Sequence, residues 1–140
     1  MRERNFQTLF TKWVKQRKWE SSVVVELKLA KGGSLPFEAV KPWQIEGLQD
    51  AQSKGVYHKI SDLPVYKGSQ TTWASKKPFD CFWIINALAY VAIWYYHPRQ
   101  KKEFILIPIN IFLKEKEQSE RKSLTEERAR EIGSVHDLIV

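Results

Sequence analysis

The sequence is poor in cysteine and has no long hydrophobic run. Cys81 is its single cysteine among 140 residues, so no disulfide can form within the chain, and a reducing, cytoplasmic location is expected. The longest apolar stretch, residues 81–96, is interrupted by Asn86 and is shorter than the roughly 20 residues that a membrane-spanning helix needs. The first twenty residues are basic and amphipathic and lack the apolar segment of a signal peptide. We therefore expect no membrane partner.

What the sequence does contain predicts a packed core. Hydrophobic residues make up 43% of the chain, with 6 Trp, 5 Tyr and 7 Phe, which excludes a disordered protein. A chain of this length is expected to form a single domain. The aromatic surroundings of Cys81 favour a buried position for this thiol over a nucleophilic role.

The positive charge is concentrated in the first four fifths of the chain. The net charge is +7, and residues 114–140 contribute 6 of the 23 basic and 7 of the 16 acidic residues. Residues 1–113 therefore hold 17 basic and 9 acidic residues, a net charge of +8. A compact basic domain attracts polyanions, of which nucleic acid is the commonest. A basic surface without a specific partner is the alternative.

Periodicity and turn signals predict alternating helices and strands. Pro42 suits the first turn of a helix that ends at Lys54-Gly55, and Ser123-x-x-Glu126 is a capping-box pattern that begins a last helix. The predicted order is helix 3–18, strand 22–31, helix from 42, strand 56–60, connection 61–77, strands 79–85, 90–96 and 103–111, linker 114–122 and helix 123–132. This order predicts an α/β or α+β fold with a mixed sheet flanked by helices, with residues 1–113 as the core domain and 114–140 as a charged linker and C-terminal helix.

Two charged residues interrupt the most apolar predicted strand. Glu26 and Lys28 lie two residues apart in the segment 23–30, so a strand places them on one face and the alternate apolar residues on the other. Burying these charges costs on the order of several kcal/mol unless they are paired or coordinated. The pair is therefore either an ion pair at a solvated edge or part of a site for a metal and a reacting water.

The residues around this pair resemble a known nuclease family. The order is Glu26-Leu27-Lys28, Ser34-Leu35-Pro36-Phe37, Trp43-Gln44-Ile45, and then Gly55 before an apolar strand. Together these motifs, over residues 23–60, resemble the PD-(D/E)XK nuclease superfamily, and within it most closely the RecU-type Holliday junction resolvases. The resemblance implies a restriction-endonuclease-like fold.

The resemblance also implies roles for particular residues. Glu26 and an aspartate would hold Mg²⁺, which Mn²⁺ can replace, Lys28 would orient water or stabilise the transition state, and Gln44 would lie near the active site. The family's aspartate usually precedes the Glu-x-Lys strand. Here Pro78-Phe79-Asp80 follows instead, which implies a permuted order with Asp80 on a strand next to Glu26 and the two carboxylates within about 5 Å.

Several of these assignments have alternatives. Asp62 is the reserve for Asp80, and Glu3 is a further acid on the first helix. Asp80 and Asp62 are also typical of turns, and Glu3 suits the dipole of a helix N-terminus. Phosphate contacts are expected from residues in connections around the site, with Trp73 as a base-stacking candidate: Lys31, Ser34, Lys41, Lys76 and Lys77.

The sequence thus predicts a Mg²⁺-dependent, structure-selective DNA endonuclease that acts in DNA recombination or repair. A Holliday junction resolvase is the leading interpretation, and it implies a homodimer because a two-fold enzyme can cut two symmetric strands. The alternatives are another nuclease of the superfamily, a non-catalytic basic DNA-binding module, and a protein-interaction domain in which Glu26 and Lys28 form a salt bridge.

Overall fold

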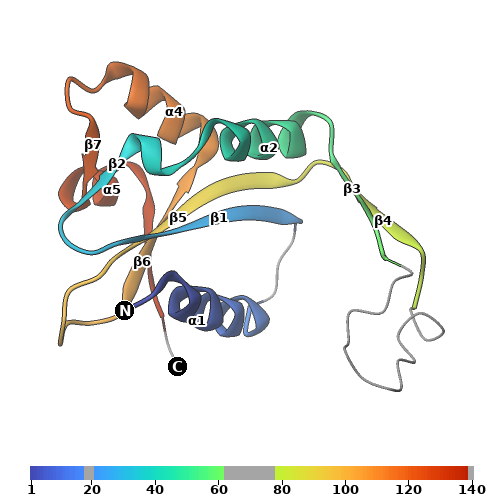
Figure 1. Ribbon diagram of the computed structural model, residues 1–140, viewed down its shortest axis with the longest axis horizontal. Helices are drawn as coiled ribbons and strands as arrows, with labels where there is room; N and C mark the ends of the chain where they lie inside the picture. The colour runs from blue at the N-terminus through green and yellow to red at the C-terminus, as the bar shows by residue number, and fades with distance from the viewer. Residues whose placement is uncertain (18–20, 62–77, 139–140) are drawn as a thin grey trace.

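The computed structural model describes residues 1–17, 21–61 and 78–138, and Figure 1 shows their arrangement. The elements are α1 (Glu3–Lys15), β1 (Val23–Ala30), β2 (Ser34–Pro36), the 3-10 turn η1 (Phe37–Ala39), α2 (Pro42–Ser53), β3 (Val56–Lys59), β4 (Cys81–Ile84), β5 (Leu88–Tyr95), β6 (Glu103–Pro108), α4 (Ile109–Gln118), β7 (Ser123–Thr125), α5 (Glu126–Ile132) and β8 (Ser134–Asp137). Among these residues, no helix is long and apolar enough to cross a membrane.

A four-stranded mixed sheet in the order β1-β5-β6-β8 forms the centre of the fold. β1 runs parallel to β5, with Glu26 opposite Val91, whereas β6 is antiparallel to both β5 and β8. A parallel pair requires a crossover connection, and α2 lies in that connection. The predicted α+β class with a mixed sheet is confirmed.

Helices cover both faces of this sheet (Figure 1). α1 packs on one face, where Phe6, Phe10 and Trp13 contact Trp94 and Phe104. These helical residues recur every three to four positions, so a single stripe of α1 is buried. α2, α4 and α5 cover the other face and enclose a second apolar cluster. The two clusters together form the core of the molecule.

The C-terminal quarter differs from its prediction. The helix α4 replaces the end of the strand expected to reach residue 111 and much of the expected linker 114–122. The N-cap of α5 is Thr125 and not Ser123, because the Thr125 hydroxyl accepts a hydrogen bond from the Arg128 N–H. β7 pairs with β2, and β8 adds a strand to the main sheet beside β6. The predicted boundary at residue 113 lies within α4, and strands on its two sides pair with each other.

β3 and β4 form a two-stranded ribbon, here called the arm, which is separate from the main sheet. Figure 1 shows it extending away from the sheet and its helices. The arm leaves the body at Gly55 and returns through Asn86, which have positive φ angles of 88° and 55°. Left-handed backbone at these two points sets the direction of the arm, since glycine and asparagine tolerate it best. The predicted strand 79–85 thus exists but does not join a meander with β5 and β6.

Candidate functional site

The two faces of β1 have the composition that its alternation predicts. Val25, Leu27 and Leu29 pack into the cluster beneath α1. Val24 and Ala30 join the cluster beneath α2. Glu26 and Lys28 alternate with Val25, Leu27 and Leu29, so they lie on the same face of β1 as Val24 and Ala30, which is the face covered by α2. The sequence predicted that the two charged residues share a face.

Glu26 is the centre of a small polar cluster on this face. Its Oε1 lies 3.1 Å from Lys28 Nζ and accepts a hydrogen bond of 2.7 Å from Gln44 Nε2. The side chains of Lys28 and Glu26 are 13% and 26% exposed. Both charges are thus largely removed from water, and each has a partner that offsets part of the cost of burial.

The start of α2 fixes the third member of the cluster. Pro42 occupies the first turn of α2, where a missing N–H costs no hydrogen bond. The Gln44 Oε1 accepts a hydrogen bond of 2.9 Å from the Lys41 N–H, as in one half of a capping box. With its oxygen held by the backbone, the amide directs its NH₂ group to Glu26. The structure thus brings Gln44, a predicted site residue, into contact with Glu26.

β1 is one of the two edge strands of the main sheet. Its pairing with β5 extends from Val23 to Ala30, and in the described part of the chain no strand pairs with its other side. The polar cluster therefore lies at a sheet edge whose backbone groups can accept another strand.

Asp80 does not lie on a strand beside Glu26 of the same chain, and this expectation is wrong. The residue directly precedes β4, and β4 pairs with β3, whereas the neighbour of β1 is β5. Asp80 is exposed on the arm, and its backbone carbonyl accepts a hydrogen bond of 2.7 Å from the Ile60 N–H. The physical reason is the left-handed exit at Gly55 and Asn86, which turns the arm away from the sheet.

Glu3 is also placed away from the cluster. It begins α1, which packs on the sheet face opposite α2. The sheet therefore separates Glu3 from Glu26, and its position in the first turn of α1 suits the helix dipole.

The predicted phosphate-binding residues are divided. Lys31, Ser34 and Lys41 are exposed in the segments between β1 and α2, on the chain that leads from Lys28 to Gln44. Asp62, Trp73, Lys76 and Lys77 lie outside the described residues.

Sequence reasoning missed two features. Trp43, the residue before Gln44, is 69% exposed; its place in the Trp-Gln-Ile motif was the available signal. Cys81 is exposed, which corrects the expectation of a buried thiol. Its strand is apolar, but it belongs to the arm and not to the core.

The polar cluster by itself does not fit a Mg²⁺ site. Mg²⁺ requires oxygen ligands, usually from one or two carboxylates, and Glu26 is the one carboxylate of the cluster. No group of three His, Cys, Asp or Glu side chains that could hold a metal occurs among residues 1–17, 21–61 and 78–138. A second carboxylate would have to come from elsewhere.

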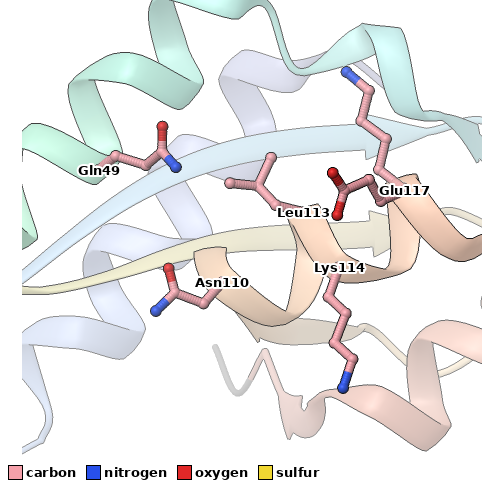
Figure 2. Close-up of a pocket in the computed structure, with 6 residues that line it drawn as sticks. Gln49, Asn110, Leu113, Lys114 and Glu117 are labelled. Atoms are coloured by element: carbon pink, nitrogen blue, oxygen red, sulfur yellow. The ribbon is translucent and has the colours of Figure 1, made fainter.

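A hollow of about 660 Å³ lies apart from this cluster, between α2 and α4. Figure 2 shows Gln49 on α2 and Asn110, Leu113, Lys114 and Glu117 on α4, which line this hollow. Its lining combines amides, one leucine and charges of both signs. None of the three cluster side chains is part of it.

A second group of charged side chains connects α5 to the sheet. His97 Nε2 lies 2.7 Å from Glu126 Oε2, and Arg130 contacts both Glu126, at 3.1 Å, and Glu103, at 2.8 Å. Burial raises the pKa of Glu126, but hydrogen bonds from His97 and Arg130 outweigh it, and the net pKa is lowered. These contacts stabilise the docking of α5.

Comparisons with models of known families, with curated proteins and with solved structures give no match for this chain. The fold and the site therefore define it only as an α+β domain with a Glu-Lys-Gln cluster on an edge strand.

Proposed function

We propose that this protein is a structure-selective DNA endonuclease of the PD-(D/E)XK type that depends on Mg²⁺, with a Holliday junction as its leading substrate. One observation carries the proposal: Glu26 of an apolar strand is in contact with Lys28 of that strand and with Gln44 of the following helix. These are three residues of the motifs on which the resemblance rests, and they meet although 18 positions separate Gln44 from Glu26.

The cluster supplies part of the chemistry that phosphodiester cleavage requires. Negative charge develops on the phosphoryl oxygens in the transition state, and the Lys28 ammonium can donate hydrogen bonds to them. The Glu26 carboxylate can accept a hydrogen bond from a water molecule, while Gln44 and Lys28 hold it in place. Because the cluster is largely shielded from water, its charges act more strongly than they would in bulk solvent.

DNA is the partner that the charge of the chain favours. The chain has a net charge of +7. Lys31 and Lys41 are exposed and lie in the connection between Lys28 and Gln44. Phosphate contacts from such residues position a duplex without reading its sequence. A reducing, cytoplasmic location suits the single, exposed thiol of Cys81.

The test compares cleavage of a synthetic four-way junction with cleavage of linear, nicked and flap DNA in Mg²⁺ or Mn²⁺. We expect Glu26→Gln and Lys28→Ala each to reduce the single-turnover rate about 10²–10³-fold, because a preorganised group is lost from the transition state. Junction binding, measured by fluorescence anisotropy at fixed salt, should change little.

Lys54→Ala is the matched control, because it removes the same charge from an exposed pair with Asp50. Its cleavage rate should equal that of the unaltered protein. If both cluster variants cleave as fast as the Lys54 variant, Glu26 and Lys28 form only a structural ion pair and the proposal fails.

A non-catalytic DNA-binding module is the second candidate. The observation in its favour is that no group of three His, Cys, Asp or Glu side chains that could hold a metal occurs in the described part of the chain. For such a module, junction binding would depend steeply on salt, and no cleavage would occur with either metal.

A further inference from the structure

The most exposed large hydrophobic side chain in the described part of the chain lies on the body and not on the arm. Trp43 is 69% exposed and is the second residue of α2, between Pro42 and Gln44. A single exposed apolar side chain is common on protein surfaces and needs no explanation by itself. Its surroundings therefore decide whether Trp43 has a role.

The backbone of Trp43 is held next to the polar cluster. The following residue, Gln44, accepts a hydrogen bond of 2.9 Å from the Lys41 N–H and donates one of 2.7 Å to Glu26. Pro42 restricts the backbone on the other side of Trp43. Because neighbouring Cα atoms are about 3.8 Å apart, the indole is attached one residue from the cluster, at a helix start that is fixed in place.

Gly47 leaves the helix surface one turn beyond Trp43 uncovered. Residues four apart lie on the same face of a helix, and helical side chains lean towards the N-terminus, so a side chain at position 47 would lie towards the indole. Gly47 is inside α2, its φ angle is not positive, and a Cβ atom there meets nothing within 4 Å. Glycine is unfavourable inside a helix, and no packing contact among the described residues requires it here.

Trp43 and Gly47 together form a platform that suits a flat ring. The indole supplies an aromatic face, and the bare helix surface beside it gives room that a longer side chain at position 47 would fill. Nucleobases stack on exposed aromatic side chains whatever their sequence, because every base has a π-face. A base inside a duplex is already stacked and paired, so an unpaired base reaches such a platform at the lowest cost.

The charges around the platform favour a nucleic acid strand as the partner. Lys31 and Lys41 are exposed in the connection that leads to α2, residues 1–113 carry a net charge of +8, and the N-terminus of a helix is partly positive. Glu46 is exposed further along α2, and its carboxylate repels phosphate from that side. A bound strand would thus place its phosphates towards Lys41 and its base towards Gly47.

We propose that Trp43 determines the specificity of this protein by stacking on an unpaired base of bound DNA, next to the phosphate at the polar cluster. Gly47 gives the base its room. The inference rests on the proposed function and names what its structure selectivity recognises, an unpaired base at a gap, flap or branch point. A continuous duplex offers no such base and is bound through its phosphates alone.

The test measures DNA binding without divalent ions, so that it does not depend on cleavage. Fluorescence anisotropy at fixed salt compares a fully paired duplex with the same duplex carrying a short single-stranded gap. We expect the unaltered protein to bind the gapped DNA about tenfold more tightly, because one stacked base adds to the phosphate contacts. Trp43→Ala should reduce this preference to about twofold or less, whereas Trp43→Phe, which keeps an aromatic face, should retain most of it.

Gly47→Gln separates a role in binding from a role in folding. Glutamine favours a helix over glycine, so this variant should unfold in urea at the same or a higher concentration than the unaltered protein. Its side chain would lie towards the indole and fill the room for a base, so its preference for gapped DNA should fall to about twofold or less. A 2-aminopurine in the gap reports the stacking directly, because its fluorescence should be quenched by the unaltered protein and much less by this variant.

Trp83→Ala is the matched control, because it removes a tryptophan that is 63% exposed on the arm. This variant should prefer gapped DNA as strongly as the unaltered protein does. Circular dichroism shows whether each variant is folded, and Trp43→Leu replaces Trp43→Ala if the alanine variant is not.

Three results would overturn the inference. They are an unchanged preference in Trp43→Ala, an unchanged preference in Gly47→Gln, and an equal loss of preference in Trp83→Ala. If the unaltered protein cleaves DNA through Glu26 and Lys28 while any of these holds, the inference fails and the proposed function stands. If the preference depends on Trp43 but no cleavage occurs in Mg²⁺ or Mn²⁺, the inference stands and the non-catalytic module replaces the nuclease. If the unaltered protein binds no DNA, both fail.

Discussion

The body and the arm of this protein use similar residues in opposite ways. In the body, Trp94, Phe104 and Phe6 are at most 2% exposed, and Phe6 of α1 contacts the other two rings. In the arm, Tyr57 and Trp83 also contact each other, with ring centroids 5.7 Å apart, yet they are 57% and 63% exposed. The local sequence is apolar in both regions.

The difference shows that burial depends on what covers a strand. The central strands β5 and β6 have helices on their faces, so they hold most of the buried residues. The arm has two strands and no helix packed on it among the described residues. A two-stranded ribbon is marginally stable by itself.

The largest effect is expected from truncating the centre of the body. Phe104 is fully buried and contacts Phe6, Phe10, Trp13 and His136. Phe104→Ala should lower the free energy of unfolding by about 3–5 kcal/mol, because it leaves a cavity in addition to the lost apolar burial.

Trp83→Ala on the arm is the comparison for this variant. It should change the free energy of unfolding in urea by no more than about 0.5 kcal/mol. Equal losses for the two variants would mean that the arm is part of the cooperative core.

An intermediate effect is expected at Gly133, where α5 passes into β8. A Cβ atom there would lie 2.7 Å from Ile105 Cγ2, 2.8 Å from Ile107 Cγ1 and 2.9 Å from the Leu106 carbonyl oxygen. Gly133→Ala should therefore destabilise the body by about 1–3 kcal/mol, because β8 must shift away from β6.

Gly47→Ala is the matched control for the Gly133 substitution. Gly47 lies in α2, and a Cβ atom there meets nothing within 4 Å. This substitution should stabilise the protein by up to about 1 kcal/mol, because alanine favours a helix. A loss of stability for the Gly47 variant in thermal unfolding would contradict the expected absence of a clash.

The smallest effect is expected from His136, whose protonation makes the free energy of unfolding depend on pH. Burial between Trp13 and Phe104 lowers the pKa of His136, the positive charge of Arg17 lowers it further, and Asp137 partly opposes this. The Ser134 hydroxyl lies 2.9 Å from its Nε2. Because the unfolded chain binds the proton more tightly, the contribution of His136 to stability is fully present above its ordinary pKa of 6.5 and is lost as the pH falls through the folded pKa.

Lowering the pH from about 7.5 to about 5.5 should thus reduce the free energy of unfolding more in the unaltered protein than in His136→Gln. His58→Gln is the matched control, because it removes a histidine from the exposed arm without changing the body. The prediction is wrong if the His136 variant and the unaltered protein have the same pH dependence.

Local patterns were sufficient to predict much of the body. The spacing of Phe6, Phe10 and Trp13 predicted α1, and Pro42 with Gly55 predicted both ends of α2, as the structure confirms. The alternation in β1 predicted that Glu26 and Lys28 share a face. These features depend on residues within a few positions of one another, where helix and strand periodicity apply directly.

Long-range pairing could not be predicted in the same way. The α4 helix was mistaken for a strand end and a linker, because its charged second half lacks a strong apolar stripe. The addition of β8 to the sheet depends on the close approach of the chain to β6 that Gly133 permits. A short sequence pattern does not predict such a contact. Asp80 was misplaced because an apolar strand after an aspartate does not specify which strand it pairs with.

The sequence by itself determined the class of the fold, the charge of the chain and the residue types of the polar cluster, since these follow from composition and local periodicity. Only the tertiary structure decided that Gln44 meets Glu26, that β1 is an edge strand, and that the arm points away from the body. The physical reason is that contacts between distant segments depend on backbone direction at a few positions, here Gly55 and Asn86, and on which strand edges remain unpaired.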